Sequence, residues 1–207
     1  MLLYLVLFFP GISSQAPVVT IISFSAFREF GRLFTYTIPA LALIWYLILE
    51  KKSLDISVSD IKPKKTDLIS FAIGFPLLIL SGALVTLLMN KLDPNVKMPV
   101  IEAPGSVQGW IIMVISCTGT GYLEESFFRF YLLRKLNEWI RSRPLKIIFS
   151  VLLFSLCHSY EGPWGILNAA LAGLSLSILY EKYRTIHGIA WSHACYNAIV
   201  YVMGIFV

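Results

Sequence analysis

The chain has 207 residues, of which 57% are hydrophobic and 14% are charged, and its mean hydropathy is +0.74. Soluble domains are about half apolar and a quarter charged, so this composition excludes an ordinary soluble globular protein. The formal net charge is +5. We interpret the basic residues as topology signals of a membrane protein. Aromatic and basic side chains do not alternate outside the apolar segments, so we expect no nucleic-acid partner.

Hydrophobic segments recur along the chain, and a crossing of the bilayer needs about 20 such residues, or about 17 at the short end. The longer segments are residues 33–49, 68–89, 108–133, 164–180 and 186–206. Residues 146–160 are fewer, but basic residues, Pro and Gly bound them, so we include them. Residues 2–27 form one bent helix if Pro10 and Pro17 are accommodated as kinks. The sequence therefore predicts an all-α polytopic membrane helix bundle of about seven transmembrane helices, in one domain of residues 1–207.

The loops between these segments differ in charge. Seven crossings put the loops 50–67, 134–146 and 181–185 on one side, and those loops hold twelve of the seventeen Lys and Arg residues. Loops rich in Lys and Arg face the cytoplasm. We therefore expect a cytoplasmic N-terminus.

Three polar motifs lie in apolar segments of the second half of the chain. They are Glu124-Glu125-Ser-Phe-Phe-Arg129, Phe154-Ser-Leu-Cys-His158 and His193-Ala-Cys-Tyr-Asn197. Ionisable side chains are costly within a bilayer and are by default evidence of a functional site. The third histidine of the chain, His187, lies beside a basic turn and is expected at the membrane interface.

Helix geometry assigns different parts to the first motif. Glu125 and Arg129 are four residues apart and can form an ion pair, whereas Glu124 is rotated by about 100° from Glu125. This leaves Glu124 as the carboxylate free to accept and return a proton. The alternative is that the three charges only neutralise one another between helices.

The other two motifs also have a spacing of four residues. His193 and Asn197 present an imidazole and an amide on one helical face, from which both can donate hydrogen bonds to one oxyanion. The alternative is a hydrogen-bonded pair that ties two helices together. Phe154 can shield His158, and a histidine of this kind taken alone is more often a satisfied interior residue than a catalytic one. We expect Glu124, His158 and His193 to meet in a cavity that faces the cytoplasm.

The three cysteines, Cys117, Cys157 and Cys195, lie in apolar segments without the spacing of a disulfide framework or a zinc site. We expect them to be small buried hydrophobic residues. A thiol nucleophile beside either of the two motif histidines is the alternative.

The ordered set E-E-x-x-x-R, F-x-x-x-H and H-x-x-x-N resembles the CPBP (Abi) family of intramembrane proteases, which includes the type II CAAX prenyl endopeptidases. The resemblance covers about residues 108–207 and implies that they are the catalytic core, with residues 1–107 as accessory N-terminal helices. It also implies that Glu124 and His158 activate a water. In the same resemblance His193 and Asn197 stabilise the oxyanion, and Glu125 and Arg129 are structural.

The resemblance leaves the cofactor open, because such enzymes have also been called metalloproteases. Zinc held by Glu124, His158 and His193 is the alternative, but the chain lacks H-E-x-x-H and we favour a glutamate mechanism without a metal. The implied substrate is a membrane-associated protein or peptide, prenylated or not. The short chain favours a prokaryotic member in the plasma membrane.

Two further classes of function compete with a protease. One is a non-enzymatic scaffold or immunity factor built on the same helices, and the other is a small transporter whose Glu and His side chains carry protons. A transporter would be expected to have two inverted halves. The polar residues of this chain are instead concentrated in its second half.

Overall fold

The computed structural model describes Phe8, residues 21–50, Ile56, residues 58–96, residues 100–203 and Ile205. This part of the chain is almost entirely helical. Its first half contains β1 (Ile21–Ile22), α2 (Ala26–Arg32), the π-helix η1 (Leu33–Thr37), α3 (Ile38–Leu49), α4 (Val58–Ile61), α5 (Lys65–Leu92) and β2 (Val100–Ile101). The second half contains α6 (Val107–Glu125), the π-helix η2 (Ser126–Leu132), α7 (Leu133–Lys135), η3 (Leu136–Glu138), α8 (Arg143–Leu156), η4 (Ser159–Glu161), α9 (Gly162–Tyr183) and α10 (His187–Met203).

Local signals in the sequence explain where these helices begin. The Ser25 and Ser106 side chains accept hydrogen bonds from the backbone N–H groups of Arg28 and Gly109, which caps α2 and α6. Prolines occupy the first turns of α8 and α9, where no backbone N–H is needed. At its other end α9 stops at Arg184, which has the left-handed conformation common after a helix.

The all-α membrane bundle predicted from the sequence is confirmed. Three helices of the described residues are long and apolar enough to cross a membrane, namely Ala26–Leu49, Lys65–Leu92 and Ser159–Tyr183. The number of seven crossings is not confirmed. The 28 residues of α5 span about 42 Å at about 1.5 Å per residue, which exceeds the hydrocarbon thickness of a bilayer.

The predicted N-terminal helix of residues 2–27 is wrong in the part that the structure describes. Residues 21–22 form β1, which pairs in parallel with β2, and the next helix already begins at Ala26. The Ser25 cap explains this boundary. The rest of that prediction, apart from Phe8, lies outside the described residues.

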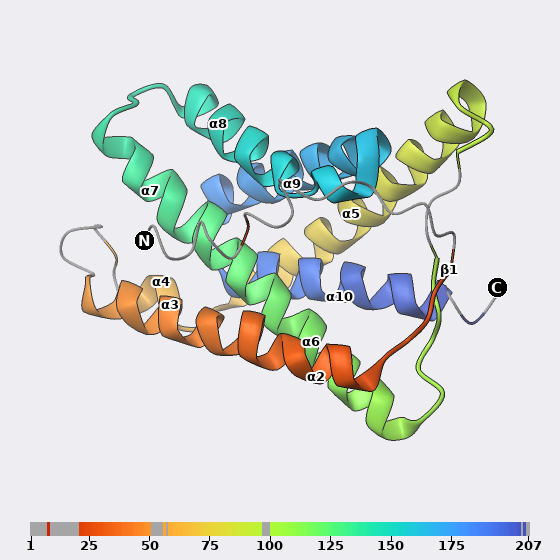
Figure 1. Cartoon of the computed structure of the whole chain (residues 1–207). Coiled ribbons are helices and arrows are strands. Elements are labelled where there is room, and N and C mark those ends of the chain that lie inside the picture. Colours follow the sequence, from red (N-terminus) through yellow and green to blue (C-terminus); the bar gives the residue numbers. More distant parts are fainter. Residues whose placement is uncertain are drawn as a thin grey trace.

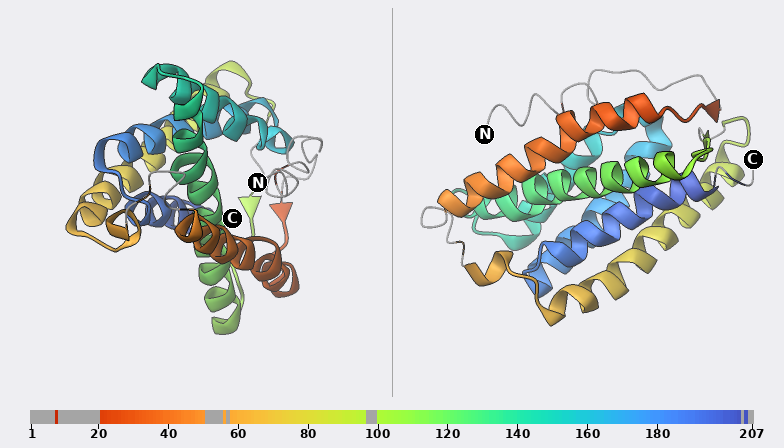
Figure 2. Two further views of the ribbon diagram at one scale, coloured as in Figure 1. Left: turned by 90° about the vertical axis from the view of Figure 1, so that its left-hand side faces the viewer. Right: turned by 90° about the horizontal axis from the view of Figure 1, so that it is seen from below.

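The helices pack in an order that differs from their order in the chain. The right-hand view of Figure 2 shows the continuous helix α2–η1–α3, then α6, α10 and α5 side by side, and these neighbours are in contact. A continuous helix runs from α6 into α7. In Figure 1, α8 and α9 lie on one side of this helix, and α2 and α3 lie on the opposite side. There α9 contacts α8, α5 and η2. Helix α6 with its extension η2 is therefore central to the bundle.

The three basic loops meet at one end of the bundle, as the charge pattern predicts. Arg134 donates to Asp60 at 2.9 Å, which links the loops 134–146 and 50–67. Glu181 accepts from Arg143 at 2.6 Å, which links the loops 134–146 and 181–185. Which side of the membrane this end faces stays a prediction.

Small residues allow close contact between α6 and α10. A Cβ atom at Gly121 would lie 2.8 Å from the carbonyl oxygen of Ala190 and 3.1 Å from the amide nitrogen of Ala194. Both are backbone atoms, so a side chain at this position cannot be accommodated by a rotamer change. Gly119 and Gly121 of α6 are buried, as are Ala169, Gly173 and Ser177 of α9.

We predict that Gly121→Val lowers the free energy of unfolding by about 1–3 kcal/mol, because overpacking at this crossing forces α6 and α10 apart. Gly31→Ala is the matched control, since a Cβ there meets nothing within 4 Å and alanine favours a helix. Reversible unfolding in detergent measures both. A Gly121→Val protein as stable as the wild type would contradict the close crossing.

Candidate active site

The two adjacent glutamates lie at the end of α6, where the helix widens into η2. Glu124 is 7% exposed and Glu125 is fully buried. The π-helix that follows contains Arg129, which is also fully buried. Segments of π-helix are rare in proteins, and those that occur are often found at functional sites. The wider turn redirects the side chains.

Glu125 and Arg129 form the predicted ion pair. Arg129 Nη1 donates to Glu125 Oε1 at 3.0 Å, with both side chains inaccessible to solvent. Arg129 also donates to the carbonyl oxygen of Gly173 at 3.2 Å and to Ser177 Oγ at 3.4 Å, both on α9. The guanidinium therefore joins η2 to α9.

The same oxygen of Glu125 holds His193. The distance between His193 Nδ1 and Glu125 Oε1 is 2.8 Å, so the carboxylate joins α6 to α10 as well. Because Arg129 neutralises Glu125 as a carboxylate, Nδ1 is the donor in this contact. The other ring nitrogen, Nε2, faces Glu124 Oε2 at 3.7 Å.

Glu124 is the less constrained carboxylate of the two, as the helix geometry predicts. Its Oε2 atom is buried and has no hydrogen-bond partner within the described part of the chain. The 3.7 Å separation from His193 Nε2 is longer than a direct hydrogen bond, and a reacting group or a water can bridge such a gap. A buried carboxylate oxygen and an imidazole nitrogen thus converge on one point.

Phe154 contacts both histidines of the motifs. Its ring centroid is 4.7 Å from that of His158 and 6.0 Å from that of His193, and the Arg129 guanidinium lies 4.3 Å above it. The predicted shielding of His158 by Phe154 is confirmed. Helix α8 ends at Leu156, however, so His158 lies just beyond the helix and not within it.

The position after the helix fixes the tautomer of His158. Its Nδ1 lies 2.9 Å from the carbonyl oxygen of Phe154, which can only accept a hydrogen bond. The proton is therefore on Nδ1 and the lone pair of Nε2 is available as a base. His158 is partly buried.

Asn197 follows His193 by one turn on α10 and is half-buried. The sequence places both on one face, and the contact of His193 with Glu125 adds a constraint that the motif itself does not contain. His187, expected at the interface, lies 2.7 Å from the Tyr122 hydroxyl and 2.7 Å from the carbonyl oxygen of Ile61. It connects the start of α10 to α6 and α4, away from the other two histidines.

The cysteines do not gather at the site. Cys117 and Cys157 are buried, as expected for small hydrophobic residues. The same expectation is wrong for Cys195, which is exposed because it lies on the outward face of α10. All three thiols are free.

No group of three or more His, Cys, Asp and Glu side chains that could hold a metal ion occurs in the described ranges. Zinc held by Glu124, His158 and His193 stays an alternative prediction. His193 Nδ1 is bonded to Glu125, which leaves Nε2 as the atom of that ring that could bind a metal.

Sequence reasoning missed the contact between Glu125 and His193. A spacing of four residues predicts contacts within one helix, but nothing in the spacing says which residues of α6 face α10. The signal that could have found it is the presence of two adjacent carboxylates with only one basic partner nearby in the sequence.

The fold and the site together define an all-α membrane-type bundle with a buried glutamate and histidine centre. Residues 106–199 match the family model Rce1-like, described as type II CAAX prenyl endopeptidase Rce1-like. The match contains all three motifs and confirms the predicted family for this segment. No curated protein and no solved structure matches the chain. The family is one of proteases, which supports a membrane endopeptidase.

We predict that Arg129→Ala lowers the free energy of unfolding by about 3–5 kcal/mol, because it leaves the buried Glu125 carboxylate without a counter-charge. Arg141→Ala is the control, since that arginine is exposed and such changes usually stay within about 0.5 kcal/mol. Chemical unfolding of both variants in detergent gives the comparison. Equal stability of the two would disprove the structural role of the ion pair.

Proposed function

We propose that the protein is an intramembrane endopeptidase that hydrolyses a peptide bond of a membrane-associated protein or peptide. The observation that carries the proposal is the approach of Glu124 Oε2 to within 3.7 Å of His193 Nε2, since this oxygen has no hydrogen-bond partner among the described residues. A base and a hydrogen-bond donor on either side of one point are what peptide hydrolysis requires. The family match supports the reaction class and not these roles.

In the proposed mechanism Glu124 and His158 activate the attacking water. Glu124 takes its proton, and the Nε2 lone pair of His158 is the second acceptor of the site. The new bond joins the water oxygen to the scissile carbonyl carbon and produces a tetrahedral oxyanion. When the C–N bond breaks, the proton held by Glu124 passes to the leaving amine.

His193 and Asn197 stabilise the oxyanion. The proposal requires a proton on each nitrogen of His193, because Nδ1 donates to Glu125 and Nε2 must donate to the oxyanion. Glu125 thereby holds the ring in the orientation in which Nε2 faces the reacting carbonyl. The Asn197 amide is the second donor, and one such donor typically contributes a factor of about 100 to 1000 in rate.

The metal-free mechanism is part of the proposal, and zinc held by Glu124, His158 and His193 is its alternative. If zinc bound there, it would polarise the scissile carbonyl and activate the water. The bond from His193 Nδ1 to Glu125 is the kind of outer contact that also orients metal-bound histidines, so this bond fits both versions.

The location and orientation of the protein are proposed from the sequence alone. We propose a prokaryotic plasma membrane as the location, with the basic end of the bundle in the cytoplasm. The substrate would then reach Glu124 from within or beside the membrane. A non-enzymatic scaffold or immunity factor is the competing function, in which Glu124 would help to hold partner complexes together without catalysis.

We predict that Glu124→Gln abolishes peptide hydrolysis and leaves the fold unchanged. The substitution keeps the size of the side chain and removes the basic carboxylate. Proteomic comparison of membranes with the wild type and the variant identifies the uncleaved substrate, and purified protein then cleaves it in vitro.

The matched control is Glu138→Gln, which removes the same charge from an exposed residue that pairs with Lys135. The control should cleave at the wild-type rate. Cleavage by purified Glu124→Gln would remove Glu124 from the mechanism, and unchanged peptide profiles with lost partner complexes would favour the scaffold.

We predict that prolonged treatment with a chelator leaves the activity intact, because the proposed base and donors are protein groups. Elemental analysis of the purified protein should find zinc well below one equivalent. Loss of activity that zinc alone restores would instead assign Glu124, His158 and His193 as ligands.

A further inference from the structure

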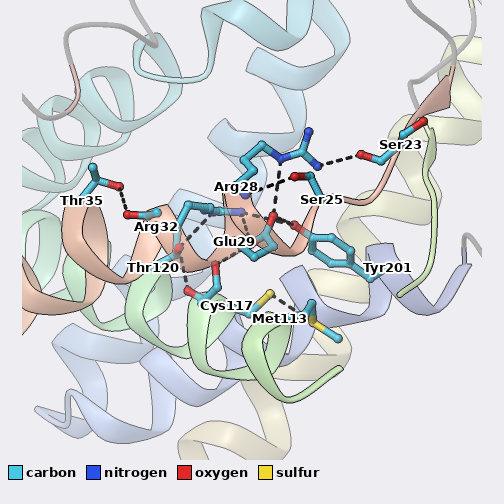
Figure 3. Close-up of polar contacts among 12 residues, drawn as sticks. Ser23, Ser25, Arg28, Glu29, Arg32, Thr35, Met113, Cys117, Thr120 and Tyr201 are labelled. Atoms are coloured by element: carbon cyan, nitrogen blue, oxygen red, sulfur yellow. Dashed lines mark hydrogen bonds and ion pairs between the residues drawn. The ribbon is translucent and has the colours of Figure 1, made fainter. Parts of the chain in front are cut away.

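A second polar cluster lies outside the three motifs, around a fully buried glutamate of α2. Figure 3 shows Glu29 surrounded by side chains of α2, α6 and α10. Ser116 Oγ donates to Glu29 Oε2 at 2.6 Å, and the Tyr201 hydroxyl donates to Glu29 Oε1 at 2.8 Å. Arg32 Nη1 donates to Glu29 Oε2 at 3.3 Å. The Glu29 carboxylate therefore joins its own helix, α2, to α6 and α10.

Arg32 extends the cluster along both partner helices. Its Nη2 atom donates to Thr120 Oγ1 on α6 at 3.0 Å, and its Nη1 atom donates to the Tyr201 hydroxyl on α10 at 3.3 Å. The planar guanidinium thus spans from one helix to the other, which a lysine ammonium cannot do in the same way.

These contacts lie one to two helical turns from the candidate site on the same two helices. On α6, Thr120 precedes Glu124 by four residues. On α10, Asn197 lies midway between His193 and Tyr201, four residues from each. Because positions four apart share a face, the two clusters belong to one polar seam between α6 and α10. Glu124 and His193 meet at one level of this seam, and Thr120 and Tyr201 are joined by Arg32 at another.

Apolar side chains would hold α2 in place at a smaller cost of desolvation than a buried carboxylate and guanidinium. The directional hydrogen bonds of this pair, however, fix α2 in one position relative to α6 and α10. We propose that Arg32, held by Glu29, is a positioning residue that fixes α6 against α10 and so sets the geometry of Glu124, His193 and Asn197. This inference rests on the proposed function.

The kinetic test compares Arg32→Ala with Arg28→Ala. Arg28 lies on the same helix, is 45% exposed and approaches Glu29 only to 3.7 Å, so it is the matched control. We expect kcat of Arg32→Ala to fall about 10- to 100-fold with KM within about twofold, because small misplacements of reacting groups reduce rate and not binding. Arg28→Ala should retain the wild-type kcat. An unchanged kcat for Arg32→Ala, or a change confined to KM, would overturn the proposal.

A milder pair keeps the test decisive if Arg32→Ala does not fold. Thr120→Val removes the acceptor that Arg32 uses on α6 and also the bond that this hydroxyl donates to the Ser116 carbonyl oxygen. Thr118→Val removes a bond of the second kind alone, to the Val114 carbonyl oxygen, and is therefore the matched control. Thr120→Val should lower kcat more than Thr118→Val does. Equal rates for the two variants would count against a positioning role.

Hydrogen exchange followed by mass spectrometry tests the contact without any reliance on activity. Backbone amides of α2 should exchange faster in Arg32→Ala than in Arg28→Ala, with α5 unchanged in both. Unchanged exchange in α2 would overturn the proposal even if the protein is a protease. Conversely, an active Glu124→Gln enzyme would refute the proposed function. Hydrogen exchange would then still test the contacts of Arg32 independently.

Discussion

The fold depends on one buried carboxylate, that of Glu125. It accepts from Arg129 and from His193, and Arg129 in turn bonds to α9. Three helices, α6 with its extension η2, α9 and α10, are thereby fixed by a single charge network in an interior where an unpaired charge is strongly unfavourable. Phe154 packs against this network, since its ring contacts the guanidinium and both histidines.

Polarity is distributed in the opposite way to that of a soluble domain. Large apolar side chains face outward on the helices, among them Leu68, Leu80 and Leu87 on α5, which are 64%, 64% and 68% exposed. Charged residues such as Glu29, Glu125 and Arg129 are fully buried. In lipid the apolar surface gains nothing by turning inward, so small residues and hydrogen bonds hold the helices together.

The sequence predicts best what is encoded within one helix. The pairing of Glu125 with Arg129 and the shielding of His158 by Phe154 follow from a spacing of four residues, and α5 follows from hydropathy. Contacts between helices could not be predicted in this way. The spacing therefore assigns Glu125 only to Arg129, and the apolar segment around Cys195 places that residue in the interior. The bent helix of residues 2–27 failed where a capping serine and a short strand replace it, because hydropathy alone does not register such local signals.

The alignment of α6 with α10 restricts how a protein of this kind can change in length. One residue inserted between Thr120 and Glu124, or between His193 and Tyr201, would rotate the rest of that helix by about 100°. The two polar clusters would then no longer lie on the same face of the helix. Two separate networks would then have to be rebuilt together. Natural relatives that vary in length should carry their insertions in the segments that connect the helices, with these two intervals constant even where the residues within them differ.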